Sequence, residues 1–289
     1  MIGKSKAQLL IIDPQNSFCE PGLPPGMAEG ADIGKYTRIP ERGSLYVENA
    51  EKSMQRIADM IDRVGKRFVD IHASEDAHHK FSIFHPPFIV DKFNNHPGPY
   101  TGISHEDIAN GNFRAYRTAY QKWLFDYTRD LEASNRFTHP IKHTIWPLHC
   151  LIGSRGSNIF PPLLKALDKW EDNPGIVNHV TKGSNYKVEH YSILRSEVPD
   201  PDDPGTLLNS DLIKIIQKAD PLVVGGEASN FCVACTVLDI CIEFGTAKNI
   251  VLLLDGMDPV PGFEYLYDEF IDKAKTLDVQ FSTTTEIFT

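Results

Sequence analysis

The sequence predicts an α/β fold: a doubly wound, mostly parallel sheet with helices on both faces. Two observations predict it. Short, continuous apolar runs, which are typical of strands buried on both faces, recur along the chain. Between them lie segments with apolar residues at spacings of three and four, as in amphipathic helices. Strands that alternate with helices in this way form parallel sheets covered on both sides.

The expected elements follow one another from the amino terminus. The first strand is expected at residues 7–12 (AQLLII), and an apolar stripe over residues 47–64 predicts a helix that ends near Gly65. A second strand is expected at 67–71. The remaining elements are helices at 157–170, 210–218, 231–244 and 264–276 and strands at 176–181, 221–225 and 249–254.

One long segment interrupts this alternation. Residues 76–144 are rich in histidine, proline, asparagine and aromatic residues, and only 113–131 has a helical pattern. An irregular, apolar segment of this length inside a compact domain is more often a functional loop or lid than a linker. We therefore expect a single domain over residues 1–289 with an enlarged loop region at 76–144.

Composition and charge exclude several classes of partner. Twenty-nine basic residues against thirty-nine acidic ones give a formal net charge of −10, which repels nucleic acids and anionic membrane surfaces. No apolar run approaches the roughly 20 residues of a membrane helix. The five cysteines are an odd and sparse set, unlike a secreted disulfide framework. We therefore expect a cytoplasmic protein with neither a nucleic-acid nor a membrane partner.

Four polar residues are expected just beyond the carboxyl ends of strands, where the loops of an open α/β sheet meet over one crevice. They are Asp13, Asp70, Lys182 and Cys232. A cysteine is a nucleophile only as the thiolate, which a helix amino terminus and a nearby cation favour. Cys232 opens an expected helix, and Lys182 would add positive charge. Asp13 would accept the thiol proton and later deliver it to a leaving group.

Each of these residues also has a structural interpretation. An aspartate after a first strand is often a turn cap, a lone lysine is usually solvated, and a cysteine in an apolar helix is more often a core residue. The spacing of Cys232 and Cys235 also fits a redox pair or half a zinc site. Thioredoxin-like pairs usually enclose small or turn-forming residues, unlike Val233 and Ala234, and the sequence offers no second pair for zinc. We therefore expect Cys235 to be a packing residue.

Three motifs occur in one order along the chain: "LLIIDPQNSF", the "KG" at Lys182 with "EHYSIL" downstream, and "ASNFCV". By these motifs the sequence resembles the isochorismatase-like cysteine hydrolases, which include nicotinamidases, over about residues 7–254. The resemblance implies the isochorismatase-like hydrolase fold and a catalytic triad of Asp13, Lys182 and Cys232. True isochorismatases lack the cysteine, so its presence favours hydrolysis of amides or related acyl compounds.

The resemblance also implies how the site is built around the cysteine. The family has a cis peptide bond four residues before it, here between Glu227 and Ala228. The backbone N–H groups of Ala228 and Cys232 would then form the oxyanion hole. Phe18 and Trp146 match aromatic positions that wall a flat substrate in nicotinamidases, although core packing would explain these two residues equally well.

Histidines are concentrated in "VDIHASEDAHHKFSIFHP" and "WPLHC". Asp70 and His72 lie at i and i+2, so on an extended strand end they point the same way. A loop histidine alone is more often an unspecialised polar residue. The resemblance, however, implies a divalent metal, with zinc as the first choice, held by Asp70, His72 and His149, with His78 or His85 as a further ligand. Such a metal would hold a donor atom of the substrate.

The sequence departs from the family at this motif: it reads "DIHA" where the family usually has Asp-Trp-His-Pro or a similar sequence. About seventy residues also separate Asp70 from "WPLHC", where the family has a short loop. The added segment must lie beside or over the crevice, so these departures bear on the substrate pocket more than on the triad.

These observations together predict a cysteine amidohydrolase that cleaves a small carboxamide, as a nicotinamidase does, and releases ammonia through a thioester. Three alternatives remain open: a hydrolase of carbamoyl or other non-aromatic amides with the same triad, a non-catalytic binding protein that keeps the fold, and a metal-dependent hydrolase in which the cysteine is a bystander. The resemblance also implies a homo-oligomer.

Overall fold

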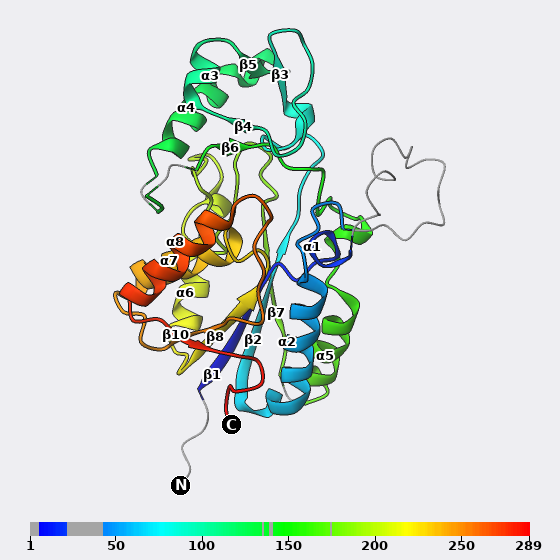
Figure 1. Cartoon of the computed structure of the whole chain (residues 1–289), viewed down its shortest axis with the longest axis vertical. Helices are drawn as coiled ribbons and strands as arrows, with labels where there is room; N and C mark the ends of the chain where they lie inside the picture. Colours follow the sequence, from blue (N-terminus) through cyan, green and yellow to red (C-terminus); the bar gives the residue numbers. More distant parts are fainter. Residues whose placement is uncertain (1–5, 22–42, 135, 139–140, 174) are drawn as a thin grey trace.

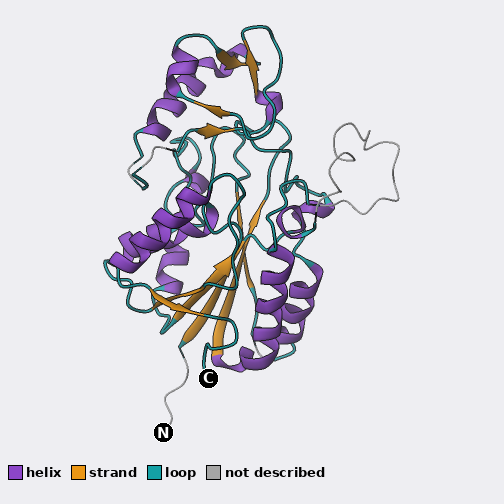
Figure 2. Cartoon of the chain, viewed as in Figure 1, coloured by secondary structure: helices purple, strands orange, loops and turns teal. Residues whose placement is uncertain are grey.

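The structure is a computed structural model that describes residues 6–21, 43–134, 136–138, 141–173 and 175–289. Its centre is a six-stranded sheet in the order β10-β9-β8-β1-β2-β7, and every neighbouring pair in it is parallel. Helices cover both faces of this sheet (Figure 2). The predicted α/β fold with a mostly parallel sheet is confirmed.

The six strands run in the same direction, from the end of the sheet near the amino terminus towards the site described below (Figure 1). Their bounds are β1 (Ala7–Ile12), β2 (Phe68–Asp76), β7 (Asn178–Lys182), β8 (Leu222–Gly226), β9 (Ile250–Leu253) and β10 (Gln280–Ser282). All residues of β1 are buried, because it lies inside the sheet and helices cover both faces. A continuous apolar run suits such a strand.

The helices form two layers. One face carries α2 (Ala50–Val64) and α5 (Pro161–Glu171), which pack side by side, and the other carries α6 (Ser210–Ile216), α7 (Cys232–Phe244) and α8 (Glu264–Thr276) (Figure 1). Short helical turns are α1 (Asn16–Cys19), η1 (Gly65–Arg67), η2 (Pro86–Phe88), η3 (Thr118–Tyr120), η4 (Arg155–Ser157) and η5 (Pro204–Thr206). Among the described residues, no helix has the length and apolarity needed to cross a membrane.

The segment expected to be an enlarged loop has a structure of its own. It contains β3 (Ile89–Asp91) paired with β5 (Phe113–Ala115), β4 (Gly102–Ile103) paired with β6 (His143–Thr144), α3 (His105–Ala109) and α4 (Gln121–Glu132). These elements lie beyond the carboxyl end of the sheet (Figure 1). Trp123 and Tyr127 of α4 bind the main chain of residues 187 and 189, so the segment packs directly on the loop that follows β7.

Several elements differ from the predictions. Strand β2 continues to Asp76 instead of ending at residue 71. The segment predicted as one helix at 113–131 is divided, because Phe113–Ala115 pairs with β3 as a strand and the helix begins only at Gln121. Strand β10 and helix α3 were not predicted. The helix at Glu264–Thr276 and the strand at Ala7–Ile12 have the predicted bounds.

Candidate active site

Lys182 is the last residue of β7, and its side chain is buried. Its Nζ lies 2.9 Å from Oδ2 of Asp13, 2.6 Å from Oδ1 of Asp76 and 2.8 Å from the carbonyl oxygen of His190. The Sγ atom of Cys232 lies 3.7 Å from the same nitrogen. The structure therefore brings the predicted Asp13, Lys182 and Cys232 together and adds Asp76, which was not predicted.

The sheet explains why these side chains meet. Asp13 follows β1, Asp76 ends β2, and Lys182 ends β7, so all three lie at the carboxyl edge of adjacent strands. Asp76 and Lys182 are register partners. Cys232 begins α7 a few residues beyond the end of β8, the neighbour of β1 on its other side.

Asp13 has the environment of an acid–base group. Ser74 Oγ donates a hydrogen bond to its Oδ1 at 2.6 Å, and the backbone N–H of Asp13 donates to that same hydroxyl at 3.0 Å. Burial raises the pKa of Asp13 to about 6, with a further contribution from Asp76, while Lys182 and Ser74 oppose the rise. A carboxyl with this pKa is ionised at neutral pH and readily takes up a proton.

The pKa of the Cys232 thiol is shifted upwards, whereas a nearby cation and a helix amino terminus favour a downward shift. Burial raises the pKa of Cys232 well above its ordinary value, and Asp13 and Asp76 add to the rise, so the opposing effect of Lys182 is outweighed. Burial thus opposes the expected effect of Lys182 and the helix amino terminus, which favour the thiolate. One oxygen of Asp13, one of Asp76 and the sulfur lie within 4.8 Å of one another, so a carboxylate is close enough to receive the thiol proton.

Lys182 keeps its charge despite its burial. Burial lowers the pKa of Lys182, but Asp13 and Asp76 more than compensate, and the net shift is well upwards. The site therefore holds a permanent ammonium group beside the sulfur. Such a group would stabilise a thiolate once it forms.

The loop before α7 carries the predicted backbone feature. The peptide bond between Glu227 and Ala228 is cis, as the resemblance implied. The carbonyl oxygen of Ala228 accepts hydrogen bonds from the N–H groups of Phe231 and Val233, both at 3.1 Å. Within the described part of the chain, the N–H groups of Ala228 and Cys232 donate to no other group, so both are free to bind a ligand oxygen.

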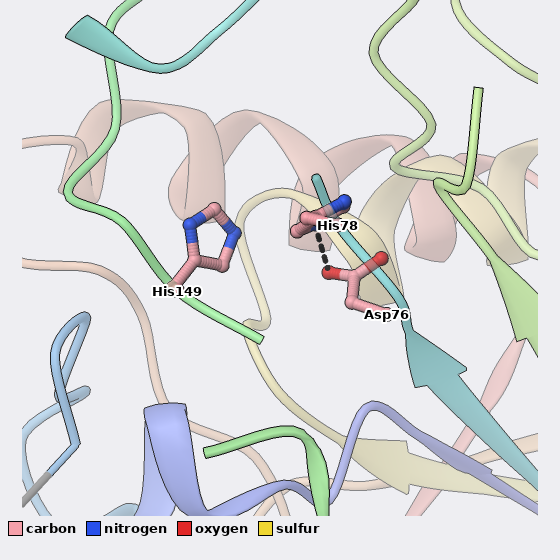
Figure 3. A group of neighbouring side chains, drawn as sticks. All are labelled: Asp76, His78 and His149. Atoms are coloured by element: carbon pink, nitrogen blue, oxygen red, sulfur yellow. Dashed lines mark ion pairs between the residues drawn. The ribbon is translucent and has the colours of Figure 1, made fainter. Parts of the chain in front are cut away.

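A set of side chains that could hold a metal ion adjoins the lysine. Asp76, His78 and His149 each offer one ligand atom, and these atoms lie within 4.8 Å of one another (Figure 3). Nε2 of His78 lies 3.3 Å from Oδ2 of Asp76, and Nε2 of His85 lies 3.3 Å from Nδ1 of His149. Burial and the charge of His78 lower the pKa of His149 and bring that of His85 to about 3, so these two rings stay neutral and can act as ligands.

His78 is oriented by the residue after the lysine. Its Nδ1 donates to the carbonyl oxygen of Gly183 at 3.0 Å, which leaves Nε2 directed to Asp76. Gly183 has φ +77°, and a Cβ there would lie 2.4 Å from Cε1 of His78. The glycine of the "KG" motif is thus required both by the backbone and by close approach of the imidazole.

Asp70 and His72 are not part of this cluster, and their assignment as metal ligands is corrected. They precede Asp76 on β2 by six and four residues, which is about 20 and 13 Å along a strand. Asp70 lies instead at the amino-terminal side of the sheet, beside Gln8. The Asp-x-His pair at the strand end is Asp76 and His78, which the segment "EDAHH" contains.

The imidazole of His72 is already fully hydrogen-bonded. Its Nε2 donates to Oε1 of Gln8 at 3.1 Å, and its Nδ1 accepts from Nδ2 of Asn178 at 3.0 Å. Both ring nitrogens are thus used within the sheet. This is a satisfied core histidine and not a ligand.

The two aromatic residues expected to wall a substrate flank the site. The ring of Phe18 in α1 lies 5.6 Å from that of His149, edge-on. Trp146 donates from Nε1 to the hydroxyl of Tyr191 at 3.1 Å and packs 5.1 Å from the ring of Phe231, the residue before Cys232. Both side chains are buried, one beside His149 and the other beside the residue that precedes Cys232.

Sequence reasoning missed a second buried carboxyl near the site. Burial raises the pKa of Glu189 to about 8, and the charges of His78, Asp76 and Lys182 act on it. This residue begins the "EHYSIL" stretch, which supported the resemblance but drew no individual assignment. Cys235, expected to be a packing residue, is fully buried in α7.

Comparisons with known proteins agree on the fold. No protein-family model matches the chain, and no curated protein matches its sequence. Solved structures do match it: the nicotinamidase/pyrazinamidase of Acinetobacter baumanii has a TM-score of 0.61 at 17% identity, over 99% of this chain and 100% of that one. Yeast nicotinamidase Pnc1p bound to the inhibitor nicotinaldehyde has a TM-score of 0.60 at 17% identity, over 96% and 99% of the two chains.

A third match is the pyrazinamidase of Pyrococcus horikoshii in complex with zinc, with a TM-score of 0.52 at 16% identity over 96% of this chain and 99% of that one. These matches extend over almost the whole length of both chains in each case. The chain therefore has the fold of the nicotinamidases and pyrazinamidases, the isochorismatase-like hydrolases that its motifs resemble.

Proposed function

We propose that this chain is a cysteine amidohydrolase that converts a small carboxamide, with nicotinamide as the first candidate, into the carboxylate and ammonia. The observation that carries the proposal is the position of Lys182, whose Nζ lies 2.9 Å from Asp13 and 3.7 Å from the sulfur of Cys232. A nucleophile, a base and a fixed positive charge are thereby combined in one buried site.

The proposed reaction begins with proton transfer. Asp13 takes the proton of the Cys232 thiol, and the thiolate, stabilised by Lys182, attacks the amide carbon. A carbon–sulfur bond forms, and the carbonyl oxygen becomes an oxyanion that accepts hydrogen bonds from the N–H groups of Ala228 and Cys232. Asp13 then gives its proton to the nitrogen as the carbon–nitrogen bond breaks, which releases ammonia and leaves a thioester.

Hydrolysis of the thioester completes the cycle. Asp13, again ionised, accepts a proton from water while the water oxygen attacks the thioester carbon. The second oxyanion uses the same two N–H groups. When it collapses, the carbon–sulfur bond breaks, Asp13 returns the proton to sulfur, and the carboxylic acid product forms and loses its proton to water or to the released ammonia.

Asp76, His78 and His149 fit a divalent metal ion, and the ring of His85 adjoins them. One carboxylate and two imidazoles are the donors that zinc, iron and manganese accept, and their ligand atoms lie within 4.8 Å of one another. When bound, such an ion would attract a donor atom of the substrate and help to orient the amide. Zinc is the first choice by resemblance.

Phe18 and Trp146 are proposed to contact the substrate from the two sides of the site. Their edge-on contacts with His149 and Phe231 place flat apolar surfaces near the candidate metal ligands and the nucleophile. An aromatic carboxamide would gain from such surfaces, whereas a carbamoyl compound would not. Assembly into a homo-oligomer stays a prediction.

The proposal is tested by ammonia release from nicotinamide and from a panel of primary amides. Cys232→Ala should abolish turnover and keep the fold, whereas Cys235→Ala, one helical turn further along α7, should keep most of the activity. Turnover by Cys232→Ala would overturn the cysteine mechanism. If activity in that variant also vanished with a chelator, the metal-dependent alternative would replace it, and a wild-type protein inactive on every amide would support the binding-protein alternative.

A further inference from the structure

A buried carboxyl group lies directly before Ala228. Glu227 is fully buried, with 0% of its surface exposed. Its Oε2 accepts a hydrogen bond from the backbone N–H of Asp258 at 3.2 Å, whereas its Oε1 has no hydrogen-bond partner among the described residues. The proposed reaction assigns no part to this residue.

An acid is a costly choice for packing at this position. A buried polar group without a full set of hydrogen bonds costs stability that an apolar side chain of similar size would not. Burial, with the charge of Asp258, raises the pKa of Glu227 well above its usual value, which favours the neutral acid. The single hydrogen bond to Asp258 is the interaction that an apolar residue would lose.

That hydrogen bond closes a set of main-chain contacts around Ala228. On one side, the N–H of Gly226 donates to the carbonyl of Gly256 at 2.8 Å. On the other, the N–H of Ser229 donates to the carbonyl of Asp258 at 2.8 Å. The loop that follows β9 therefore binds Gly226 and Ser229, which lie before and after Ala228. The side chain of Glu227 adds a third contact to this loop, between those two residues in sequence.

The backbone of Glu227 also joins this loop to the proposed base. Its N–H donates to the carbonyl of Ile12 at 2.8 Å, the residue before Asp13. Since the carbonyl of Ala228 is bound by the first turn of α7, the direction of the Ala228 N–H depends on the plane of the peptide that precedes it. That plane contains the carbonyl group of Glu227.

We propose that Glu227 is a positioning residue for the oxyanion: its carboxyl group binds the N–H of Asp258 and thereby fixes the peptide plane that directs the Ala228 N–H to the reacting carbonyl oxygen. This inference rests on the proposed function. Glutamine, which is neutral and has an acceptor oxygen, should replace glutamate; leucine should not.

Ser53 of α2 provides a matched control, because it contacts the same loop. Its Oγ donates to Oδ2 of Asp258 at 2.5 Å, so Ser53→Ala removes a contact to the side chain of Asp258 and leaves the contact to its N–H. Both Ser53→Ala and Glu227→Leu loosen the loop after β9. Only Glu227→Leu should disturb the direction of the Ala228 N–H.

The first measurement is steady-state kinetics of ammonia release by the full chain. In Glu227→Leu we expect kcat to fall about tenfold or more with KM changed less than about twofold, since an oxyanion contact acts in the transition state and not in the ground state. Glu227→Gln and Ser53→Ala should stay within about threefold of wild-type kcat. Equal losses in Ser53→Ala and Glu227→Leu, or no rescue by Gln, would overturn the inference.

The second measurement compares two ligands. Nicotinaldehyde can add to the sulfur of Cys232, forming a carbon–sulfur bond and an oxyanion, with the thiol proton passed to Asp13; nicotinate forms no such bond. In Glu227→Leu the inhibition constant of nicotinaldehyde should rise about tenfold or more while the Kd of nicotinate stays the same. Parallel weakening of both ligands, or of neither, would refute the positioning role. A wild type that turns over no amide would instead refute the proposed function.

Discussion

Lys182 and Asp76 form a buried ion pair, with Nζ 2.6 Å from Oδ1. The other oxygen of Asp76 lies 3.3 Å from Nε2 of His78. Burial raises the pKa of Asp76, but Lys182 and His78 outweigh it and leave the pKa well below its usual range. One permanently ionised carboxylate therefore connects the cation beside Cys232 to the candidate metal ligands, and the two halves of the site depend on the same charge.

This relationship predicts that Asp76 is indispensable and Asp70 is not. Asp76→Asn removes the charge opposite Lys182 and one metal ligand, so kcat/KM and bound metal should each fall by about 10- to 100-fold or more. Asp70→Asn makes the same chemical change in the other Asp-x-His sequence, which lies within β2. This variant should keep both kcat/KM and the amount of bound metal close to wild type. Ammonia release and metal content after purification measure the two effects. Comparable losses in the two variants would contradict this assignment.

The pKa of Asp13 should determine the acid side of the pH profile of kcat/KM. Burial raises the pKa of Asp13 to about 6. As the proposed base it must be ionised to accept the thiol proton, so kcat/KM should rise with pH through about 6 and then level off. Ser74 donates a hydrogen bond that lowers this pKa. In Ser74→Ala the rise should consequently shift to higher pH, and a profile whose acid side stays in place would show that another group titrates.

The sequence allowed a correct prediction of the parallel sheet and of the convergence of Asp13, Lys182 and Cys232, because each follows, ends or begins an element with a clear apolar pattern. Asp13 follows an unbroken apolar strand, and Cys232 opens an apolar helix. These signals are local. Residues in such positions converge by the rules of parallel sheets.

The end of β2 could not be predicted in this way. Its apolar pattern ends at Ile71, yet the strand continues through polar residues to Asp76, because β1 and β7 pair with it on both sides. Its buried side chains find partners in neighbouring strands: His72 with Gln8, and Ser74 with Asp13. Partners this far away in sequence leave no periodic signal, so the Asp-x-His pair was placed six residues too early.

The segment between β2 and α5 shows the same limit. Residues 113–131 have apolar spacings that fit one helix, but Phe113–Ala115 pairs with Ile89–Asp91 instead. The pairing depends on a strand more than twenty residues away, and tertiary contacts of this kind override local preference. The pKa of Cys232 also eluded prediction, since burial in the folded chain determines it.

Substitution of Gly183 by alanine should weaken metal binding. An alanine there would place Cβ 2.4 Å from the imidazole of His78, in addition to the strain of φ +77°. Gly111 has a similar φ, +72°, with no atom within 4 Å of the added Cβ. Gly183→Ala should therefore lower metal affinity and activity, whereas Gly111→Ala should only lower stability, by about 1–2 kcal/mol. Equal metal content in the two variants would show that His78 adapts to the displacement.

Arg136 connects the segment beyond the sheet to α7, the helix that begins at Cys232. Its guanidinium holds Asp239 of α7 through two hydrogen bonds, Nε to Oδ1 at 3.2 Å and Nη2 to Oδ2 at 2.9 Å, and it also pairs with Glu197. Only 8% of the Arg136 side chain is exposed, and both carboxylates are fully buried. Asp239 lies seven residues after Cys232, about two helical turns further along α7.

Replacing Arg136 by methionine should therefore destabilise the fold strongly. The substitution removes the arginine from the buried Glu197, whereas Asp239 keeps its ion pair with Arg195 at 2.8 Å. Removing one partner of a buried ion pair typically costs about 3–5 kcal/mol. Arg129→Met is the matched control, because Arg129 pairs with Asp126 and Asp130 on the exposed surface of α4, and its loss should hardly change the Tm. Chemical denaturation and thermal melting of both variants give the comparison.

The loss of stability in Arg136→Met should also depend on pH. Burial raises the pKa of Glu197, and Arg136 opposes that rise; without the arginine the pKa in the folded state moves further above its value in the unfolded chain. A carboxyl whose folded pKa is raised weakens the fold as it ionises, so the deficit relative to wild type should grow as pH increases from 5 to 8. A deficit that is constant over this range would mean that lost packing, and not uncompensated charge, accounts for the destabilisation.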